Sequence, residues 1–141
     1  MADGFDLQRF VDAQEPVYGR VCAELRNGRK QSHWMWFIFP QIAGLGHSSM
    51  AQRYAISSLA EAKAYLEHPI LGPRLRECTR LVLSVEGRSA REILGPPDDM
   101  KFRSCLTLFA HAAPEEPLFH DALRKYFYGA FDPLTVEKLQ H

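Results

Sequence analysis

Helix signals recur along almost the whole chain, and they constrain the fold more than any other feature of the sequence. Apolar residues repeat at intervals of three and four, most clearly over residues 71–85 and 102–109, as they do on the buried face of an α-helix. The sequence has neither an Asn-Gly hairpin turn between alternating segments nor a sustained period of two. The pattern therefore predicts an all-α fold of six to nine helices, several of them short.

Residues that begin or end helices divide this pattern into separate elements. Residues 58–61 and 89–92 both have the Ser-x-x-Glu sequence of a capping box, in which the serine and glutamate side chains satisfy free backbone N–H groups. The side chains expected to cap other helices belong to Asp6, to Asp98 or Asp99, and to Asp132, and the glycines expected to end helices are Gly28, Gly95 and Gly129.

The one segment that resembles a β-strand is the apolar run from Trp34 to Phe39. A lone strand would leave backbone groups unpaired, at a cost of about 1–3 kcal/mol for each buried group. We therefore predict a short buried helix, capped near Ser32 and stopped by Pro40. The run is also far shorter than the roughly 20 residues that cross a bilayer as a helix.

Length and composition indicate one soluble helical domain over residues 1–141. Hydrophobic residues make up 46% of the chain, which is enough for a core at this length. The formal net charge is zero, which argues against a protein dedicated to binding duplex DNA and makes nucleic acid an unlikely partner. The N-terminus has no basic segment followed by an apolar stretch, so we expect neither a signal peptide nor a membrane partner.

The three cysteines fit neither a disulfide framework nor a zinc motif, because Cys22, Cys78 and Cys105 are odd in number and widely spaced. Each lies on the apolar side of a predicted helix. We expect buried, reduced thiols in a cytoplasmic protein.

The first candidate site is the segment from Arg29 to Ser49. Lys30 and His33 stand beside two tryptophans, and a cation next to an indole can bind a phosphate and stack a base. The alternative is a solvated face with the tryptophans in the core. The loop from Gly44 to Ser48 then opens a predicted helix, whose free N–H groups and positive end suit an anion. The alternative there is an ordinary turn with a serine cap.

The second candidate site is the segment from Gly95 to Phe109. Two consecutive acids follow Pro-Pro at the start of a helix, and Lys101, Arg103 and Ser104 come within the next turns. Such a set can supply a general base together with phosphate contacts. The alternative is a well-capped helix with an intrahelical ion pair worth about a few tenths of a kcal/mol.

The residues predicted to act in catalysis are Asp98, Asp99 and His33. Those predicted to bind a ligand are Lys30, Trp34, Trp36, Gln41, Gly44, Gly46, Ser48, Lys101, Arg103 and Ser104. No spacing of His, Cys, Asp or Glu in the sequence matches a zinc or calcium site, so we expect neither a metal nor a cofactor.

Several stretches together resemble a bacterial family of unknown function, domain of unknown function family 1810, whose members are often mislabelled calpastatin. The most distinctive are "SHWMWFIFPQIAGLGHS" and "PDDMKFRSCLTLF", and the resemblance runs from about Phe5 to the C-terminus. It implies a multihelical fold and transfers no catalytic residue. Nothing in the chain justifies the calpastatin name, because calpastatin is a disordered, repeat-bearing protein and a chain this apolar should fold.

These observations lead us to expect a protein that binds or acts on a small anionic metabolite such as a nucleotide derivative, with hydrolysis as one form of that activity. The alternative is a helical protein–protein interaction module without catalysis. The first requires the two candidate segments to meet at one concave site. The second requires their polar groups to be used up in capping while an apolar patch lies exposed elsewhere.

Overall fold

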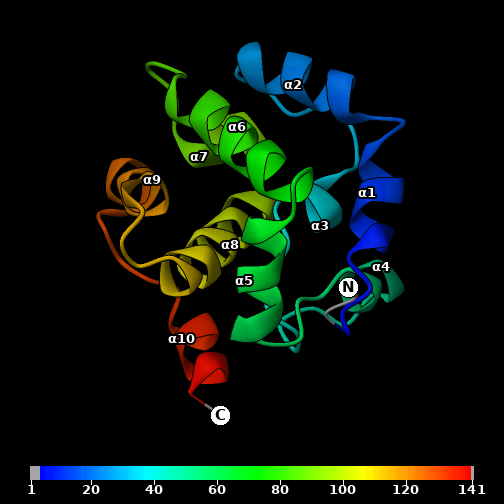
Figure 1. Ribbon diagram of the computed structural model, residues 1–141. Coiled ribbons are helices and arrows are strands. Elements are labelled where there is room, and N and C mark those ends of the chain that lie inside the picture. The colour runs from blue at the N-terminus through cyan, green and yellow to red at the C-terminus, as the bar shows by residue number, and fades with distance from the viewer. Residues whose placement is uncertain (1–3, 141) are drawn as a thin grey trace.

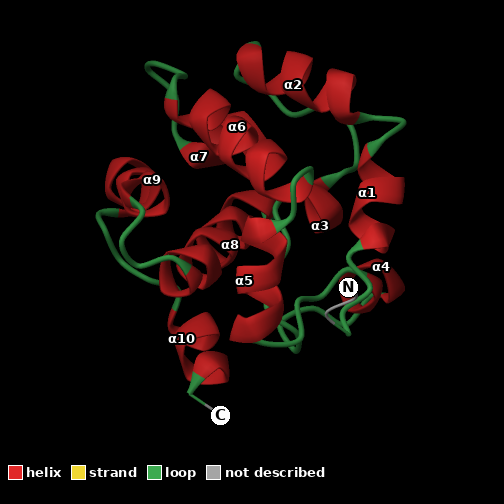
Figure 2. Cartoon of the chain, viewed as in Figure 1, coloured by secondary structure: helices red, strands yellow, loops and turns green. Residues whose placement is uncertain are grey.

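The computed structural model describes residues 4–140, and helices are the regular elements of this stretch (Figures 1 and 2). They are α1 (Gln8–Gln14), α2 (Tyr18–Arg26), α3 (Met35–Ile38), α4 (Ser49–Arg53), α5 (Leu59–Glu67), α6 (Leu71–Leu83), α7 (Ala90–Leu94), α8 (Asp98–Ala112), α9 (Pro117–Phe127) and α10 (Pro133–Leu139). The all-α prediction is confirmed. The ten helices of the described residues are one more than the predicted range, because α3, α4 and α7 are single turns of four or five residues.

Helix α8 lies in the middle of the molecule, with α5, α7, α9 and α10 packed against it (Figure 1). Its predicted apolar stripe of Phe102, Cys105, Leu106 and Phe109 is fully buried. The burial of four such side chains, at about 1.5–3 kcal/mol for each large one, makes this helix the centre of the core.

Of the predicted side-chain caps, those at Ser89 and Asp132 form in full and the one at Ser58 forms in part. Ser89 and Glu92 form both hydrogen bonds of a capping box at the start of α7. The Ser58 hydroxyl accepts from the Glu61 N–H, but the Glu61 carboxylate turns to the N–H and hydroxyl of Ser57 instead of closing the box. The Asp132 carboxylate caps α10 by accepting from the Thr135 N–H.

Three predicted caps are wrong. Asp6 forms no cap, since α1 begins after Leu7 without a side-chain hydrogen bond. Asp98 and Asp99 lie inside the first turn of α8, which begins directly after Pro97, and there they complement the helix dipole rather than capping the helix. Ser32 does not cap α3, because its hydroxyl donates to the Glu24 carboxylate at 2.6 Å.

The Glu24 carboxylate of α2 binds the residues that lead into α3. Its carboxylate also accepts from the backbone N–H groups of Gln31 and Ser32 and from the indole N–H of Trp34. Burial alone would raise the pKa of Glu24, but the hydrogen bonds from Ser32, Gln31 and Trp34 outweigh it and lower that pKa to about 2. The predicted short helix over 34–39 therefore forms as α3, against a buried carboxylate anchor.

All three cysteines are buried and free, as predicted. No helix within residues 4–140 is both long enough and apolar enough to cross a membrane.

Candidate functional site

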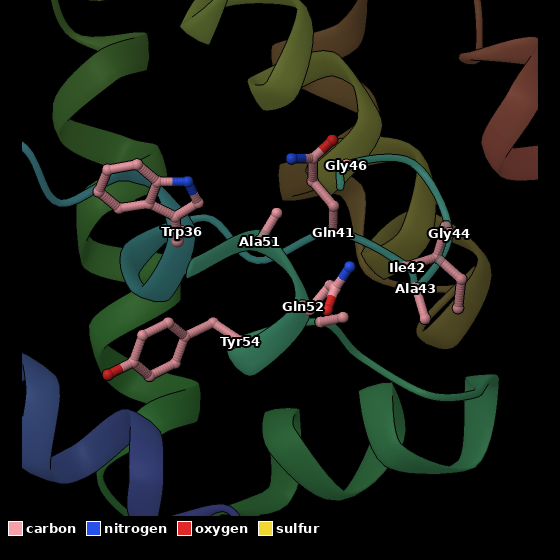
Figure 3. A pocket seen from close by; sticks show the side chains of 10 residues that line it. Trp36, Gln41, Ile42, Ala43, Gly44, Gly46, Ala51, Gln52 and Tyr54 are labelled. Atoms are coloured by element: carbon pink, nitrogen blue, oxygen red, sulfur yellow. The ribbon is translucent and has the colours of Figure 1, made fainter. Parts of the chain in front are cut away.

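A cavity of about 190 Å³ opens between the end of α3 and α4 (Figure 3). The residues that line it are Trp36, Gln41, Ile42, Ala43, Gly44, Gly46, Ala51, Gln52, Tyr54 and Ala55. Four of them, Trp36, Gln41, Gly44 and Gly46, belong to the predicted ligand-binding set. The first candidate segment therefore forms one wall, and α4 with the residues after it forms the other.

Two backbone hydrogen bonds join these walls. The Ile56 N–H donates to the Gln41 carbonyl, and the Ala43 N–H donates to the Ile56 carbonyl, each at 2.8 Å. Together they form an isolated parallel bridge between Ile42 and Ile56, both of which are buried. The bridge therefore ties the segment after α3 to the segment after α4, although it is not part of a β-sheet.

The loop after Ala43 comes back very close to α4. A Cβ atom placed on Gly46 would lie 2.7 Å from the Cβ of Ala51, nearer than two carbon atoms can approach. Glycine at position 46 therefore allows the loop to pass this close to α4. The loop ends at Ser48, whose hydroxyl caps α4 by accepting from the Ala51 N–H at 3.1 Å.

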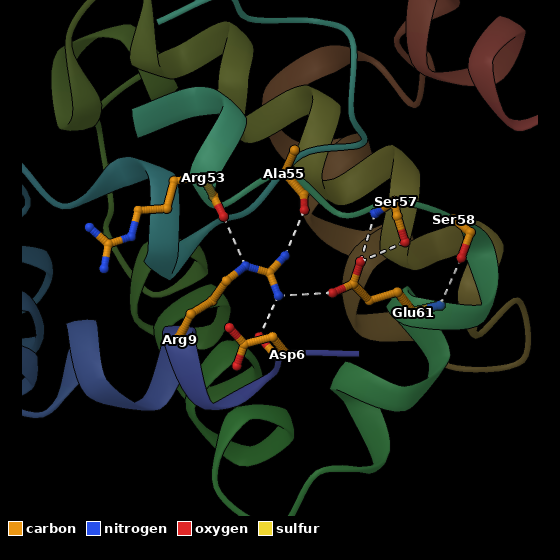
Figure 4. Close-up of polar contacts among 7 residues, drawn as sticks. All are labelled: Asp6, Arg9, Arg53, Ala55, Ser57, Ser58 and Glu61. Carbon is orange, nitrogen blue, oxygen red and sulfur yellow. Dashed lines mark hydrogen bonds and ion pairs between the residues drawn. The ribbon is translucent and has the colours of Figure 1, made fainter. Parts of the chain in front are cut away.

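Arg9 of α1 binds the backbone of the second wall, which is formed by α4 and the residues after it (Figure 4). Its guanidinium donates to the carbonyls of Arg53 and Ala55, both at 2.8 Å, and to the carbonyl of Asp6. It also forms an ion pair of 3.2 Å with Glu61, which in turn accepts from the N–H and hydroxyl of Ser57. The backbone on either side of Tyr54 is thus tied to two helices.

Three cations lie beside residues of the cavity wall, although none of the three lines the cavity itself. The Lys101 ammonium lies 5.6 Å from the ring centre of Trp36, and the Arg53 guanidinium lies 5.4 Å from that of Tyr54. Lys138 of α10 covers Gly44, where a Cβ atom would come within 3.1 Å of the Lys138 Nζ. Within residues 4–140, neither Arg53 nor Lys138 has a carboxylate in ion-pair distance. The cavity thus combines two aromatic rings with three nearby cations.

The two candidate segments meet at Asp98. Its carboxylate pairs with the Lys30 ammonium at 2.9 Å and with the Lys101 ammonium at 3.5 Å. Lys30 also lies 5.1 Å from the ring centre of Trp34. Lys101 therefore connects the start of α8 to Trp36 and so to the cavity.

Other residues of the predicted site lie outside the cavity wall. The Trp34 ring is only 1% exposed, and its N–H is bonded to Glu24. Arg103 donates to the carbonyls of Ala130 and Phe131, at 3.0 and 2.8 Å. Ser104 bonds to the Met100 carbonyl and to the Asp132 carboxylate. These three side chains are engaged within the protein, and they hold α3 and the start of α10.

Asp99 and His33 form no contact with each other in the structure. His33 is exposed, while the Asp99 Oδ1 atom is buried without a hydrogen-bond partner. Neither lines the cavity. Acid–base chemistry at Asp98, Asp99 and His33 remains a prediction. In the described part of the chain, no three residues of the His, Cys, Asp and Glu types are grouped as a metal site.

The sequence interpretation missed Gln52 and Tyr54 on the wall, Lys138 beside Gly44, and Arg9, which binds the backbone on either side of Tyr54. Tyr54 is an aromatic residue next to an arginine, the same pattern that predicted ligand contacts at residues 30–36. Arg9 has no comparable signal, because one basic residue in an amphipathic helix is ordinary.

A family model and a solved structure match this chain over nearly its whole length. A family model described as "Protein of unknown function (DUF1810)" matches residues 4–139. The chain is also similar to the crystal structure of the conserved hypothetical protein Rv1873 from Mycobacterium tuberculosis, with 58% sequence identity, 99% of each chain covered and a TM-score of 0.97. Among curated proteins the comparison found no match. The resemblance seen in the sequence is thereby confirmed, and the chain belongs to DUF1810, a family of unknown function.

Proposed function

We propose that this protein binds a small anionic metabolite with a planar ring, such as a nucleotide derivative, in the cavity beside Trp36. The observation that carries the proposal is the combination of a ring-sized cavity, two aromatic residues in its wall and cations over both rings. Aromatic faces hold planar groups, and ammonium and guanidinium groups hold phosphates or carboxylates.

The volume of the cavity limits which part of the ligand enters it. A buried cavity of about 150 Å³ is enough for benzene, whereas whole drug-sized ligands occupy roughly 300–1,000 Å³. The observed 190 Å³ therefore suits one ring. The anionic part of the ligand would lie on the rim, within reach of Lys101, Arg53 or Lys138.

Gln41 supports a polar contact inside the cavity. Its side-chain amide lines the wall and has no hydrogen-bond partner within residues 4–140, whereas the Gln52 amide donates to the His47 carbonyl at 3.1 Å. A free amide offers both a donor and an acceptor, which is what recognition of a heterocyclic ring edge requires.

A thermal-shift screen over nucleotides, nucleosides and phosphorylated sugars tests this proposal. A ligand present at 100 times its Kd stabilises the folded state by about 2.7 kcal/mol, which is a readily measured increase in Tm. We expect ring-bearing phosphates to stabilise the protein, and phosphorylated sugars without a planar ring to do so less.

Variants then locate the binding site. Trp36→Leu and Gln41→Ala should abolish the stabilisation, and Lys101→Ala should weaken it, while Lys63→Ala on the exposed face of α5 serves as the matched control. Retained binding in Trp36→Leu would exclude this cavity. Turnover of a bound ligand that is lost in Asp99→Asn would extend the proposal to hydrolysis.

A second function has one observation in its favour. Tyr128 is fully exposed, and Phe131, Leu134 and Met100 are exposed by 37–59%, so that apolar groups lie on the surface around the α9–α10 connection and the start of α8. Such a surface suits a protein partner. Binding of a partner that survives Trp36→Leu but is lost in Leu134→Ser, in a protein with no small-molecule ligand, would favour the interaction module.

A further inference from the structure

A second cavity, of about 340 Å³, shares Ile42 and Ala43 with the cavity beside Trp36. The other residues that line it come from the start of α5 and the end of α10, and they are Ser57, Ser58, Leu59, Ala60, Lys138 and Leu139. Ligand pockets in proteins have volumes of roughly 300–1,000 Å³, so this cavity is large enough for part of a ligand. The two cavities adjoin along one short segment, whose residues Ile42, Ala43 and Gly44 lie together in Figure 3.

Lys138 is the one charged residue among the described residues that line the second cavity. Within residues 4–140, its ammonium has no carboxylate in ion-pair distance. A Cβ atom on Gly44, which lines the first cavity, would lie 3.1 Å from the Lys138 Nζ. The ammonium therefore lies close to both cavities, and the missing side chain at Gly44 leaves room for it.

Helix α10 is held in place at both of its ends, which positions Lys138. At the start of α10, the Asp132 carboxylate accepts from the hydroxyls of Ser104 and Thr135, at 3.0 and 2.6 Å. At the other end, Leu139 packs against the hydrophobic core. The backbone of Lys138 is thus fixed, while its side chain stays exposed to solvent.

Ser58 supplies a second hydrogen-bond donor to this cavity. Its hydroxyl oxygen accepts from the Glu61 N–H at 3.2 Å, and within residues 4–140 no acceptor takes the hydroxyl hydrogen. The Glu61 carboxylate, which bonds to Ser57, is paired with Arg9 at 3.2 Å, so that its charge is balanced. An ammonium and a hydroxyl donor in a cavity without acidic lining residues suit an oxyanion such as a phosphate.

We propose that the ligand is a phosphorylated nucleoside, whose base enters the cavity beside Trp36 and whose sugar phosphate lies in the second cavity, with the phosphate bound by Lys138 and Ser58. This inference rests on the proposed function and narrows it, because it places the anion at Lys138 instead of at Lys101 or Arg53. The first cavity has room for a ring, and the adjoining cavity has room for the group attached to that ring.

Isothermal titration calorimetry with ribonucleosides, their 5′-monophosphates and inorganic phosphate tests the inference. We expect at least one monophosphate to bind about tenfold more tightly than its nucleoside, and inorganic phosphate alone to bind more weakly than either. Lys138→Ala should remove the preference for the monophosphate and leave nucleoside binding unchanged. Lys63→Ala is the matched control, since Lys63 is also exposed and without an ion pair within residues 4–140.

The outcomes separate this inference from the proposed function. If Trp36→Leu abolishes binding but Lys138→Ala keeps the preference for the monophosphate, the function stands and the phosphate site is wrong. Loss of the preference in Lys101→Ala or Arg53→Ala, with Lys138→Ala unchanged, has the same meaning. Equal affinity of the wild type for nucleoside and monophosphate would also overturn the phosphate site, without the use of any variant. Failure of every ring-bearing compound to bind would overturn both proposals.

Discussion

At the scale of single residues, the buried Glu24 carboxylate shows how one side chain can set a whole segment. It is 8% exposed and accepts four hydrogen bonds from Gln31, Ser32 and Trp34. A hydrogen bond to a charged group contributes about 1.5–3 kcal/mol, so the loss of this charge should exceed the effect of most surface changes.

We expect Glu24→Gln to destabilise the protein by about 3 kcal/mol at neutral pH, the equivalent of a pKa lowered from 4.5 to about 2. Because the folded-state pKa is the lower one, this stability is present above about pH 4.5 and is lost as the pH falls towards 2. Urea unfolding at neutral and acidic pH measures both effects. A difference between wild type and variant that does not shrink in acid would contradict this account.

The next prediction concerns Gly46, whose role depends on the absence of a side chain. Gly46→Ala forces the loop away from Ala51, and overpacking of this sort costs about 1–3 kcal/mol. Gly19→Ala is the matched control, because Gly19 lies in α2 with no atom near its Cβ position, and alanine there should stabilise the helix by about 0.5–1 kcal/mol. Thermal melts of the two variants should therefore move in opposite directions, and a shared direction would refute the contact.

Residue patterns alone did not separate the roles of Trp34 and Trp36. Both follow Lys30 in the same aromatic run, yet one ring is buried against Glu24 and the other lines the cavity. The difference depends on tertiary contacts, since Trp34 donates to Glu24 of α2 while α3 packs against α1. The glycines of the same segment were identified more easily, because their chemistry is local.

At the scale of helices, the end of α9 carries a residue that is poorly suited to its backbone. Tyr128 adopts the left-handed conformation with φ 57°, and its ring is fully exposed. A left-handed backbone costs a residue with a Cβ atom about 1–2 kcal/mol. The ring offsets none of this cost by packing.

Tyr128→Gly should therefore stabilise the protein by about 0.5–1 kcal/mol, after allowance for the greater freedom of glycine in the unfolded chain. Tyr128→Ala is the control that keeps the strained backbone and should give no gain. Chemical denaturation of the three proteins checks this. Equal stability of the alanine and glycine variants would mean that the backbone at 128 is not strained.

Helix positions were predictable where the signal lay within one element. The capping box at Ser89, the cap at Asp132 and the buried stripe of α8 all follow from residues three or four apart. Prediction failed at Ser32 and in part at Glu61, since each side chain bonds to a residue outside the expected cap. A polar side chain with two possible partners is decided by packing, which a local pattern does not contain.

At the scale of the whole molecule, one hydrophobic cluster extends from α1 to α9 and includes both α8 and α3. Phe109 sits within it, in ring contact with Tyr65 and Phe119. The single domain expected from the sequence is a prediction that unfolding experiments can test, because one core should unfold in one step.

We expect one cooperative transition, with the same midpoint by circular dichroism and calorimetry. Phe109→Ala should lower the stability by about 3–5 kcal/mol without splitting the transition. Phe131→Ala, at a half-exposed position, should cost much less. Two resolved transitions would show that α8 does not unite the chain.

The small-ligand hypothesis required the two candidate segments to meet, but the residues that join them were not predicted. The bond between Lys30 and Asp98 and the position of Lys101 over Trp36 connect α8 to the chain that leads into and through α3. No spacing in the sequence encodes such a pairing. The cavity wall formed by residues 51–55 and its hydrogen bonds to Arg9 likewise depend on tertiary packing.

The unequal burial of the two tryptophans gives the molecule a pair of built-in optical probes. Emission from Trp34, sealed beside a carboxylate, should shift only when the chain unfolds. Emission from Trp36, at the cavity wall, should be quenched or shifted when something occupies that space. A Trp36→Phe protein would thus report folding alone, and subtracting its signal from the wild-type spectrum would leave a direct readout of occupancy, with no label attached.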